Sequence, residues 1–122
     1  MYEVEGKVNS ALEACVKLSL ASGEEIEVVI DTGFNGDLAL PQELVQDLSL
    51  PFITQTECTL AGDITHKADV AAAHIEWLGE IHEVRVIVMP AGFLLGTQLL
   101  EGTRLTIDYD ERTVLIEKKS PL

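Results

Sequence analysis

Residues 28 to 41 read VVIDTGFNGDLALP, and the Asp31, Thr32 and Gly33 within them could support acid–base chemistry. The apolar run Val28–Ile30 is short and β-branched, which predicts a strand buried on both faces that delivers Asp31 to a turn. A carboxyl group in such apolar surroundings costs free energy unless hydrogen bonds or a shifted pKa compensate, and shifted pKa values gather at functional sites. Asp31 is therefore a candidate acid–base residue. The alternative is a simple turn former, because Asp accepts bonds from nearby amides and Gly allows a positive φ.

A second set of reactive side chains, Cys58, His66, His74 and His82, could bind a metal, because imidazole and thiolate are zinc ligands. Their spacing argues against this, since eight residues along one strand span about 26 Å at roughly 3.3 Å per residue. We interpret the histidines as surface residues and expect neither a metal nor a cofactor. Cys15 falls on the polar side of its predicted strand and is expected to be inert.

The elements that must position Asp31 follow from alternation of apolar and polar residues. Residues 12–20 alternate with Leu12 and every second residue after it inward, which predicts a half-buried strand. Ser22-Gly23 predicts a turn, and residues 25–30 return with the same period. The pair is therefore a β-hairpin that ends at Asp31.

The rest of the chain predicts short strands and little helix. Pro41 suits a first helical position, and apolar residues recur with helical spacing through PQELVQDL. The predicted strands and turns that follow are 53–60 and 66–77 joined near Ala61-Gly62-Asp63, strand 84–89, a helical turn or two in TQLLEG, and a last hairpin of 104–109 with 113–118. Eight to nine short strands and two short helices indicate a mainly β barrel or sandwich, with the central hairpin projecting from it.

Length and charge exclude several classes of protein. The 122 residues predict a single domain, 1–122, with eight basic and 21 acidic residues and a net charge of −13. Such a charge repels phosphate backbones and anionic lipid surfaces, so we expect no nucleic-acid partner. No apolar stretch reaches membrane-spanning length, and no secretory signal or disulfide framework is visible. We expect a cytoplasmic protein with reduced thiols.

The apolar strand before Asp-Thr-Gly and the later Leu94-Leu95-Gly96, followed by TQLL, resemble the retropepsin-like aspartic proteases. The resemblance covers nearly the whole chain, including the hairpin before Asp31 and a central hairpin around Gly62, where that family has its flap. The continuation LALPQELVQDLSL is closer to the cellular and bacterial single-domain members than to the viral ones. The resemblance implies a mainly β fold, a closed or nearly closed acid-protease β-barrel with one or two short helices.

The chemistry of that family explains why Asp is needed. Two carboxyl groups about 3 Å apart share one proton because they cannot both ionise, so one activates water while the other protonates the peptide carbonyl. This chain has no second Asp-Thr-Gly or Asp-Ser-Gly. The resemblance therefore implies a two-fold homodimer that brings two copies of Asp31 together.

The resemblance also implies roles for individual residues of an aspartic endopeptidase that cleaves peptides or proteins. Asp31 is the catalytic acid and base, the Thr32 hydroxyl links the two turns, and Gly33 leaves space for substrate. The expected substrate-binding residues are Phe34, Asn35, Ala61, Gly62, Asp63, Leu95 and Gly96. Two alternatives stay open: a non-catalytic dimeric module that holds a peptide uncut on the same fold, and a β-rich adaptor in which Asp-Thr-Gly is only a turn.

Two features depart from the viral pattern of the family. In the viral members, an acidic residue two positions after the glycine of Asp-Thr-Gly pairs with an arginine directly after the second glycine. In this chain those two positions hold Asn35 and Thr97. The change removes a charged contact near the expected dimer site. The C-terminal hairpin RLTIDYDERTVLIEK is also longer than the viral tail, so the dimer contact need not follow the viral one.

Overall fold

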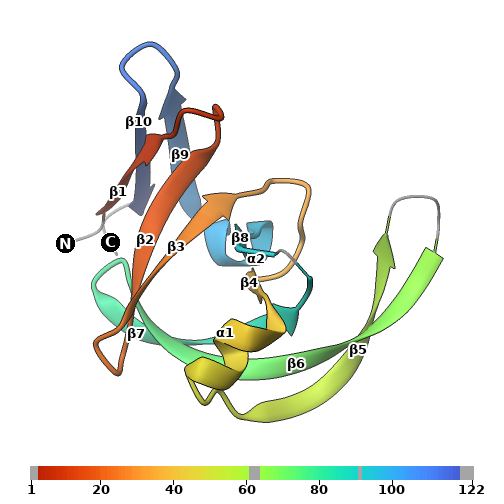
Figure 1. Ribbon diagram of the computed structural model, residues 1–122. Coiled ribbons are helices and arrows are strands. Elements are labelled where there is room, and N and C mark those ends of the chain that lie inside the picture. The colour runs from red at the N-terminus through yellow and green to blue at the C-terminus, as the bar shows by residue number, and fades with distance from the viewer. Residues whose placement is uncertain (1–2, 61–63, 91, 119–122) are drawn as a thin grey trace.

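A computed structural model describes residues 3–60, 64–90 and 92–118, which form ten strands and two short helices (Figure 1). Together the strands make one hydrogen-bonded sheet in the order β5-β6-β7-β4-β8-β3-β2-β1-β10-β9. The elements are β1 Glu3–Val8, β2 Ala14–Leu20, β3 Glu25–Ile30, β4 Leu38–Leu40, α1 Gln42–Asp47, β5 Phe52–Leu60, β6 Ile64–Trp77, β7 Glu80–Val88, β8 Leu94–Leu95, α2 Thr97–Leu100, β9 Thr103–Asp108 and β10 Thr113–Lys118.

The sheet closes on itself through a second pairing of β6. Ser19 and Leu20 of β2 pair with Glu76 and Ile75 of β6, which completes a ring of six strands: β2, β3, β8, β4, β7 and β6. Strand β5 continues the sheet beyond β6, and β1, β10 and β9 continue it beyond β2. The closed, mainly β fold is therefore confirmed, although the ring is not a regular barrel.

The core lies inside this ring and is apolar. It includes the completely buried side chains of Val28, Leu38, Ile75, Val86 and Leu95, which come from five of the six ring strands. No polar side chain is buried among the described residues. Burying such side chains stabilises the fold by roughly 1.5 to 3 kcal/mol each.

Strand β1 was not predicted, because Gly6 interrupts it and Glu3, Glu5 and Lys7 are charged and exposed. It pairs with β2 on one side and β10 on the other. A side chain at position 6 would collide with the backbone carbonyl of Cys15. The glycine that weakens the strand pattern therefore allows β1 to approach β2 closely.

Three local predictions need correction. Strand β2 begins at Ala14 rather than residue 12, because Leu12 adopts a left-handed φ of 63° in the Asn9–Glu13 turn and its side chain is 59% exposed. In β3 only Val28 of the apolar run is fully buried, while the next two residues are half-buried. Pro41 is the N-cap of α1, with extended ψ of 158°, and not its first helical residue.

The predicted central hairpin consists of β5 and β6, which extend away from the body of the molecule and bend (Figure 1). Their register runs from Phe52 opposite Ala71 to Leu60 opposite Ile64. The predicted turn residues Ala61, Gly62 and Asp63 lie outside the described residues.

Strand β5 should exchange its amide hydrogens faster than β3 in the unliganded protein. It lies at the edge of the sheet, pairs only with β6 and exposes Phe52 and Ile53, whereas β3 lies in the ring between β8 and β2. Hydrogen exchange followed by mass spectrometry would measure both strands in one sample. Equal protection of β5 and β3 would contradict a hairpin that opens for substrate.

Candidate active site

Asp31 follows directly after β3 and is fixed by its own turn and by β8. Its N–H donates to the carbonyl of Leu95 at 2.9 Å, and its Oδ1 accepts from the N–H of Gly33 at 2.9 Å. Its carbonyl accepts from the N–H of Phe34 at 3.1 Å. These bonds orient a half-buried carboxyl group whose Oδ2 has no hydrogen-bond donor among the described residues.

The loop from Asp31 to Asp37 is bound along its length to the segment 93–98. Backbone N–H groups of Gly96, Thr97 and Gln98 donate to the carbonyls of Asp37, Phe34 and Gly36, at 2.9, 2.8 and 3.2 Å. Next to them, β3 and β8 pair in parallel. The predicted second apolar-apolar-glycine element is therefore the support of the Asp31 loop, although 60 residues separate the two in sequence.

Gly96 and Phe34 make the closest contact between these two segments. A Cβ at position 96 would lie 2.6 Å from the Phe34 carbonyl oxygen and 2.7 Å from its ring, and closer still to the Gly36 carbonyl. The Phe34 ring also covers Gly36. Only glycine fits at position 96, because the carbonyls that bind the start of α2 occupy the space of a side chain.

Asn35 and Thr97, which replace the acid and arginine of the viral pattern, contact each other. The Thr97 hydroxyl donates to Asn35 Oδ1 at 3.3 Å and lies 3.4 Å from the Phe34 carbonyl oxygen. A neutral hydrogen bond therefore joins the two positions where the viral pattern has an ion pair.

Asp37 is a supporting residue that sequence reasoning missed. Its Oδ2 accepts from the N–H of Arg85 on β7 at 3.0 Å, and its carbonyl accepts from Gly96. It thereby joins the Asp31 loop to both β7 and the start of α2. The only indication of this supporting role in the sequence was the position of an Asp directly before the apolar stretch Leu38–Leu40.

Comparison with models of known families gives no match, and comparison with curated proteins gives none. Among solved structures, the chain is similar to a retropepsin-like aspartic protease from Rickettsia conorii, with a TM-score of 0.65. The match covers 95% of this chain and 91% of that chain, at 19% identity. This chain has the retropepsin-like fold. The fold implied by the resemblance is thus confirmed, and at this identity the likeness establishes the fold alone.

Within the retropepsin-like fold, the predicted site residues fall into three groups. Thr32, Gly33 and Asn35 are exposed, and Asp31 and Phe34 are half-buried, so these residues form an accessible loop. Leu95 and Gly96 are buried, and the Leu95 side chain has no exposed surface. Leu95 therefore supports Asp31 through its carbonyl, and its side chain does not contact a ligand in this conformation. Ala61, Gly62 and Asp63 lie outside the described residues.

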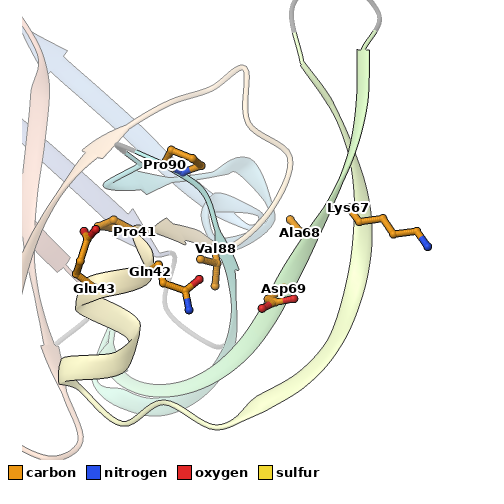
Figure 2. Close-up of a pocket in the computed structure, with 8 residues that line it drawn as sticks. All are labelled: Pro41, Gln42, Glu43, Lys67, Ala68, Asp69, Val88 and Pro90. Atoms are coloured by element: carbon orange, nitrogen blue, oxygen red, sulfur yellow. The ribbon is translucent and has the colours of Figure 1, made fainter.

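A cavity of about 410 Å³ lies away from Asp31 (Figure 2). It lies between the start of α1, residues 67–69 in the half of β6 that belongs to the projecting hairpin, and the end of β7. Its lining residues are Pro41, Gln42, Glu43, Lys67, Ala68, Asp69, Val88 and Pro90. Figure 2 shows the Lys67 side chain pointing away from α1. Asp31 does not line this cavity.

Cys15 lies on β2, His66 and His74 lie on β6, and His82 lies on β7, all outside the Asp31 loop in sequence. Cys15 is buried, contrary to its predicted polar-side position, because the turn before β2 folds over it and Asn9 Nδ2 lies 3.5 Å from its sulfur. Burial, with Glu27 and Glu13 nearby, raises the pKa of its thiol, which keeps it protonated at neutral pH. His74 and His82 lie 3.8 and 3.4 Å from Glu83 and Glu80.

The described part of the chain has neither a candidate metal-binding cluster nor a helix able to cross a membrane. No group of three His, Cys, Asp or Glu side chains there could hold a metal ion. Neither of its helices has the length and apolar character needed to cross a membrane.

Proposed function

We propose that this protein is a homodimeric aspartic endopeptidase whose site contains Asp31 from each of two copies. One observation carries the proposal: on a retropepsin-like fold, the single Asp-Thr-Gly of the chain lies on an accessible loop that the apolar-apolar-glycine element supports. Thr32 and Gly33 complete the catalytic turn. The domain spans 1–122, and a cytoplasmic location stays a prediction from the sequence.

The chemistry uses two Asp31 carboxyl groups and one water molecule. Gly33 holds Oδ1 of each carboxyl, which leaves Oδ2 for the shared proton and the water. The ionised carboxylate takes a proton from water as the water oxygen attacks the peptide carbonyl carbon, while the protonated carboxyl gives its proton to the carbonyl oxygen. The resulting diol then collapses: the carboxyl that took a proton from water gives it to the amide nitrogen as the C–N bond breaks, while the other carboxylate takes a proton from one diol hydroxyl, whose oxygen forms the new C=O bond. No metal and no covalent enzyme intermediate takes part in this reaction.

The substrate is a peptide in extended conformation between the Asp31 loop and the β5–β6 hairpin. Phe34, Asn35 and Gly96 form the floor on the loop side in this proposal, and Ala61, Gly62 and Asp63 contact the peptide from the hairpin. The exposed Phe52 and Ile53 at the base of β5 support an apolar contact with substrate side chains. The second copy supplies the opposite wall.

A second candidate is a dimeric module that holds a peptide without cleaving it. The bond from Gly33 to Asp31 Oδ1 favours it as much as it favours the enzyme, because a non-catalytic turn uses the same bond. The two functions share the fold and the dimer, and they differ only in turnover.

The test is cleavage of a diverse peptide library from about pH 3 to pH 8, with the oligomeric state measured by sedimentation in the same buffers. We expect a dimer at micromolar concentration and cleavage at the acidic end of this range. A dimer that binds peptides and cleaves none would replace the enzyme with the binding module. A strict monomer would remove both.

A further inference from the structure

Strands β6 and β7 separate at the base of the projecting hairpin. Strand β6 pairs with β7 only from Val70 onward, and residues 64–69 pair with β5 alone in the described chain. On the other side, Val88 follows the last residue of β7 that pairs with β6, and it pairs instead with Leu40 of β4. Asp69 and Val88 therefore lie at the point where the hairpin leaves the body of the molecule (Figure 1).

Two cavities are adjacent at this point. The cavity of about 410 Å³ and another of about 180 Å³ share three lining residues: Gln42 of α1, Asp69 of β6 and Val88 of β7. Figure 2 shows the Gln42 and Asp69 side chains extending into the space between α1 and β6. We call the two cavities together the α1–β6 groove. One of its walls belongs to the body of the molecule, and the other wall belongs to the hairpin.

The Asp69 carboxyl group lies in this groove without a cationic partner. It is half-buried, its Oδ1 accepts from Nε2 of Gln55 at 3.0 Å, and its Oδ2 accepts from no donor among the described residues. Neither Asp69 nor Glu43, the other acid of the groove, forms an ion pair with a described residue. Lys67 is the one cation among the described lining residues, and it points away from α1 (Figure 2). The groove therefore favours a positively charged ligand.

Apolar side chains form much of the rest of the groove. Pro41 and Pro90 line the larger cavity, and Val45 and Leu50 line the smaller one. Ligand sites combine apolar walls with a few polar groups that fix orientation, in cavities of roughly 300 to 1,000 Å³. The α1–β6 groove is therefore suited to a small ligand with a positively charged group on an apolar stem.

We propose that the α1–β6 groove binds an organic cation, with its ammonium or guanidinium group at Asp69 and its apolar stem along Val88. Such a ligand contacts α1 and β7 on one side and β6 on the other, so it holds the hairpin at a fixed angle to the body of the molecule. The cation is a free amine or a basic side chain of a peptide, because both present the same chemical group. Asp31 takes no part in this binding, which is therefore independent of peptide cleavage.

Four probes test the groove in titrations followed by the backbone amide NMR signals of residues 67–71. n-Pentylamine is a free alkylammonium ion, and N-acetyl-alanyl-lysyl-alaninamide carries the same group on a peptide. 1-Pentanol, and the same peptide with norleucine in place of lysine, keep the apolar stems without the charge. We expect at least one cation to bind about tenfold more tightly than its neutral counterpart, because only the cation makes a charge-assisted bond to Asp69. The cation that binds more tightly identifies the source, free amine or peptide.

Asp69→Asn should weaken binding of the tighter cation about tenfold and leave the neutral probes unaffected. Asn is nearly the same size, and its Oδ1 can still accept from Gln55, so the midpoint of thermal unfolding should change little. Asp47→Asn is the matched control, because it removes a carboxylate from α1 outside the lining of the groove. It should bind the cation within about twofold of wild type.

A second variant tests the position of the ligand without removing a charge. Ala68 lines the larger cavity from the hairpin side and is half-buried. Ala68→Phe should fill that space and reduce cation binding about tenfold or more, while Asp69 and Glu43 remain.

Hydrogen exchange measures the effect on the hairpin. The tighter cation at saturating concentration should slow exchange in residues 64–71 about threefold or more, because it joins the hairpin to α1 and β7. Exchange in the β9–β10 hairpin should not change, since β9 and β10 contribute no residue to the groove. Asp69→Asn should show a much smaller effect at the same cation concentration.

Three results would overturn the proposal: cations that bind no more tightly than their neutral counterparts, Asp69→Asn that binds as tightly as wild type, or Ala68→Phe that does so. A cation that binds at Asp69 and leaves exchange in the hairpin unchanged would contradict the fixed angle of the hairpin. None of these measurements depends on cleavage, so loss of the proposed function would leave the groove standing, and the reverse also holds.

Discussion

Asp31→Asn should lower peptide cleavage by roughly a thousandfold or more while the fold and the dimer remain. An amide neither takes a proton from water nor shares one with a second carboxyl group. Asn is nearly the same size, and its Oδ1 can still accept the 2.9 Å bond from the Gly33 N–H. The dimer should be no weaker, because the substitution removes the repulsion between two adjacent carboxylates.

Wild-type cleavage should rise and then fall with pH, because the reaction needs one Asp31 carboxyl ionised and the other protonated. When both are protonated no base remains, and when both are ionised no acid remains. The measurement is the rate on one library-derived peptide from about pH 3 to pH 8 for wild type and Asp31→Asn. Equal rates for the two proteins would place catalysis elsewhere or in a contaminant.

Gly96→Ala should destabilise the protein by about 2 to 4 kcal/mol and lower the midpoint of thermal unfolding by about 10 °C. The new methyl group would lie 2.6 Å from the Phe34 carbonyl oxygen and would overlap the Gly36 carbonyl. Both oxygens accept bonds from the start of α2, so neither can move without breaking the support of the Asp31 loop. Cleavage should fall with stability, since that loop carries the catalytic carboxyl.

Gly102→Ala is the matched control for this substitution. Gly102 has a left-handed φ of 80°, but a Cβ there meets no atom within 4 Å. Its cost should be about 1 kcal/mol, which reflects backbone strain alone. Thermal unfolding of both variants separates the two effects. If Gly96→Ala were as stable as Gly102→Ala, the Asp31 loop and the segment 93–98 could separate with little loss of stability.

Local patterns in the sequence predicted most elements, because each depends on residues close together in the chain. The alternation in β2, the hairpin that ends at Asp31, helix α1 and the last hairpin all correspond to observed elements. The failures were local as well. Leu12 continues the apolar period, but the Asn9 side chain accepts N–H bonds from Ala11 and Glu13 and fixes a turn there. Strand β1 was missed because of Gly6. A glycine in a strand can mean weak strand propensity or a close approach to the neighbouring strand, and the sequence does not distinguish the two.

The candidate site was predicted in part for the same reason. Asp31, Thr32 and Gly33 form a contiguous motif, and a motif can be read without knowing the fold. The partners of the loop could not be read in this way. Asp37 resembles any loop aspartate in sequence, yet it joins the loop to Arg85, 48 residues later. Leu95 was expected to contact substrate, and its side chain lies in the core instead.

The sequence by itself determined most of the strands, the position of the single Asp-Thr-Gly and the need for a second carboxyl group in any dyad. Tertiary structure alone decided which strands are neighbours. Strand β3 pairs in parallel with β8, β4 pairs in parallel with β7, and β2 meets β6 to close the ring. These pairings join segments more than 40 residues apart. They depend on how whole strands pack around one core, and the alternation of apolar and polar residues within one strand does not specify its neighbours. The same closure leaves β9 as the last strand of the sheet in the described chain.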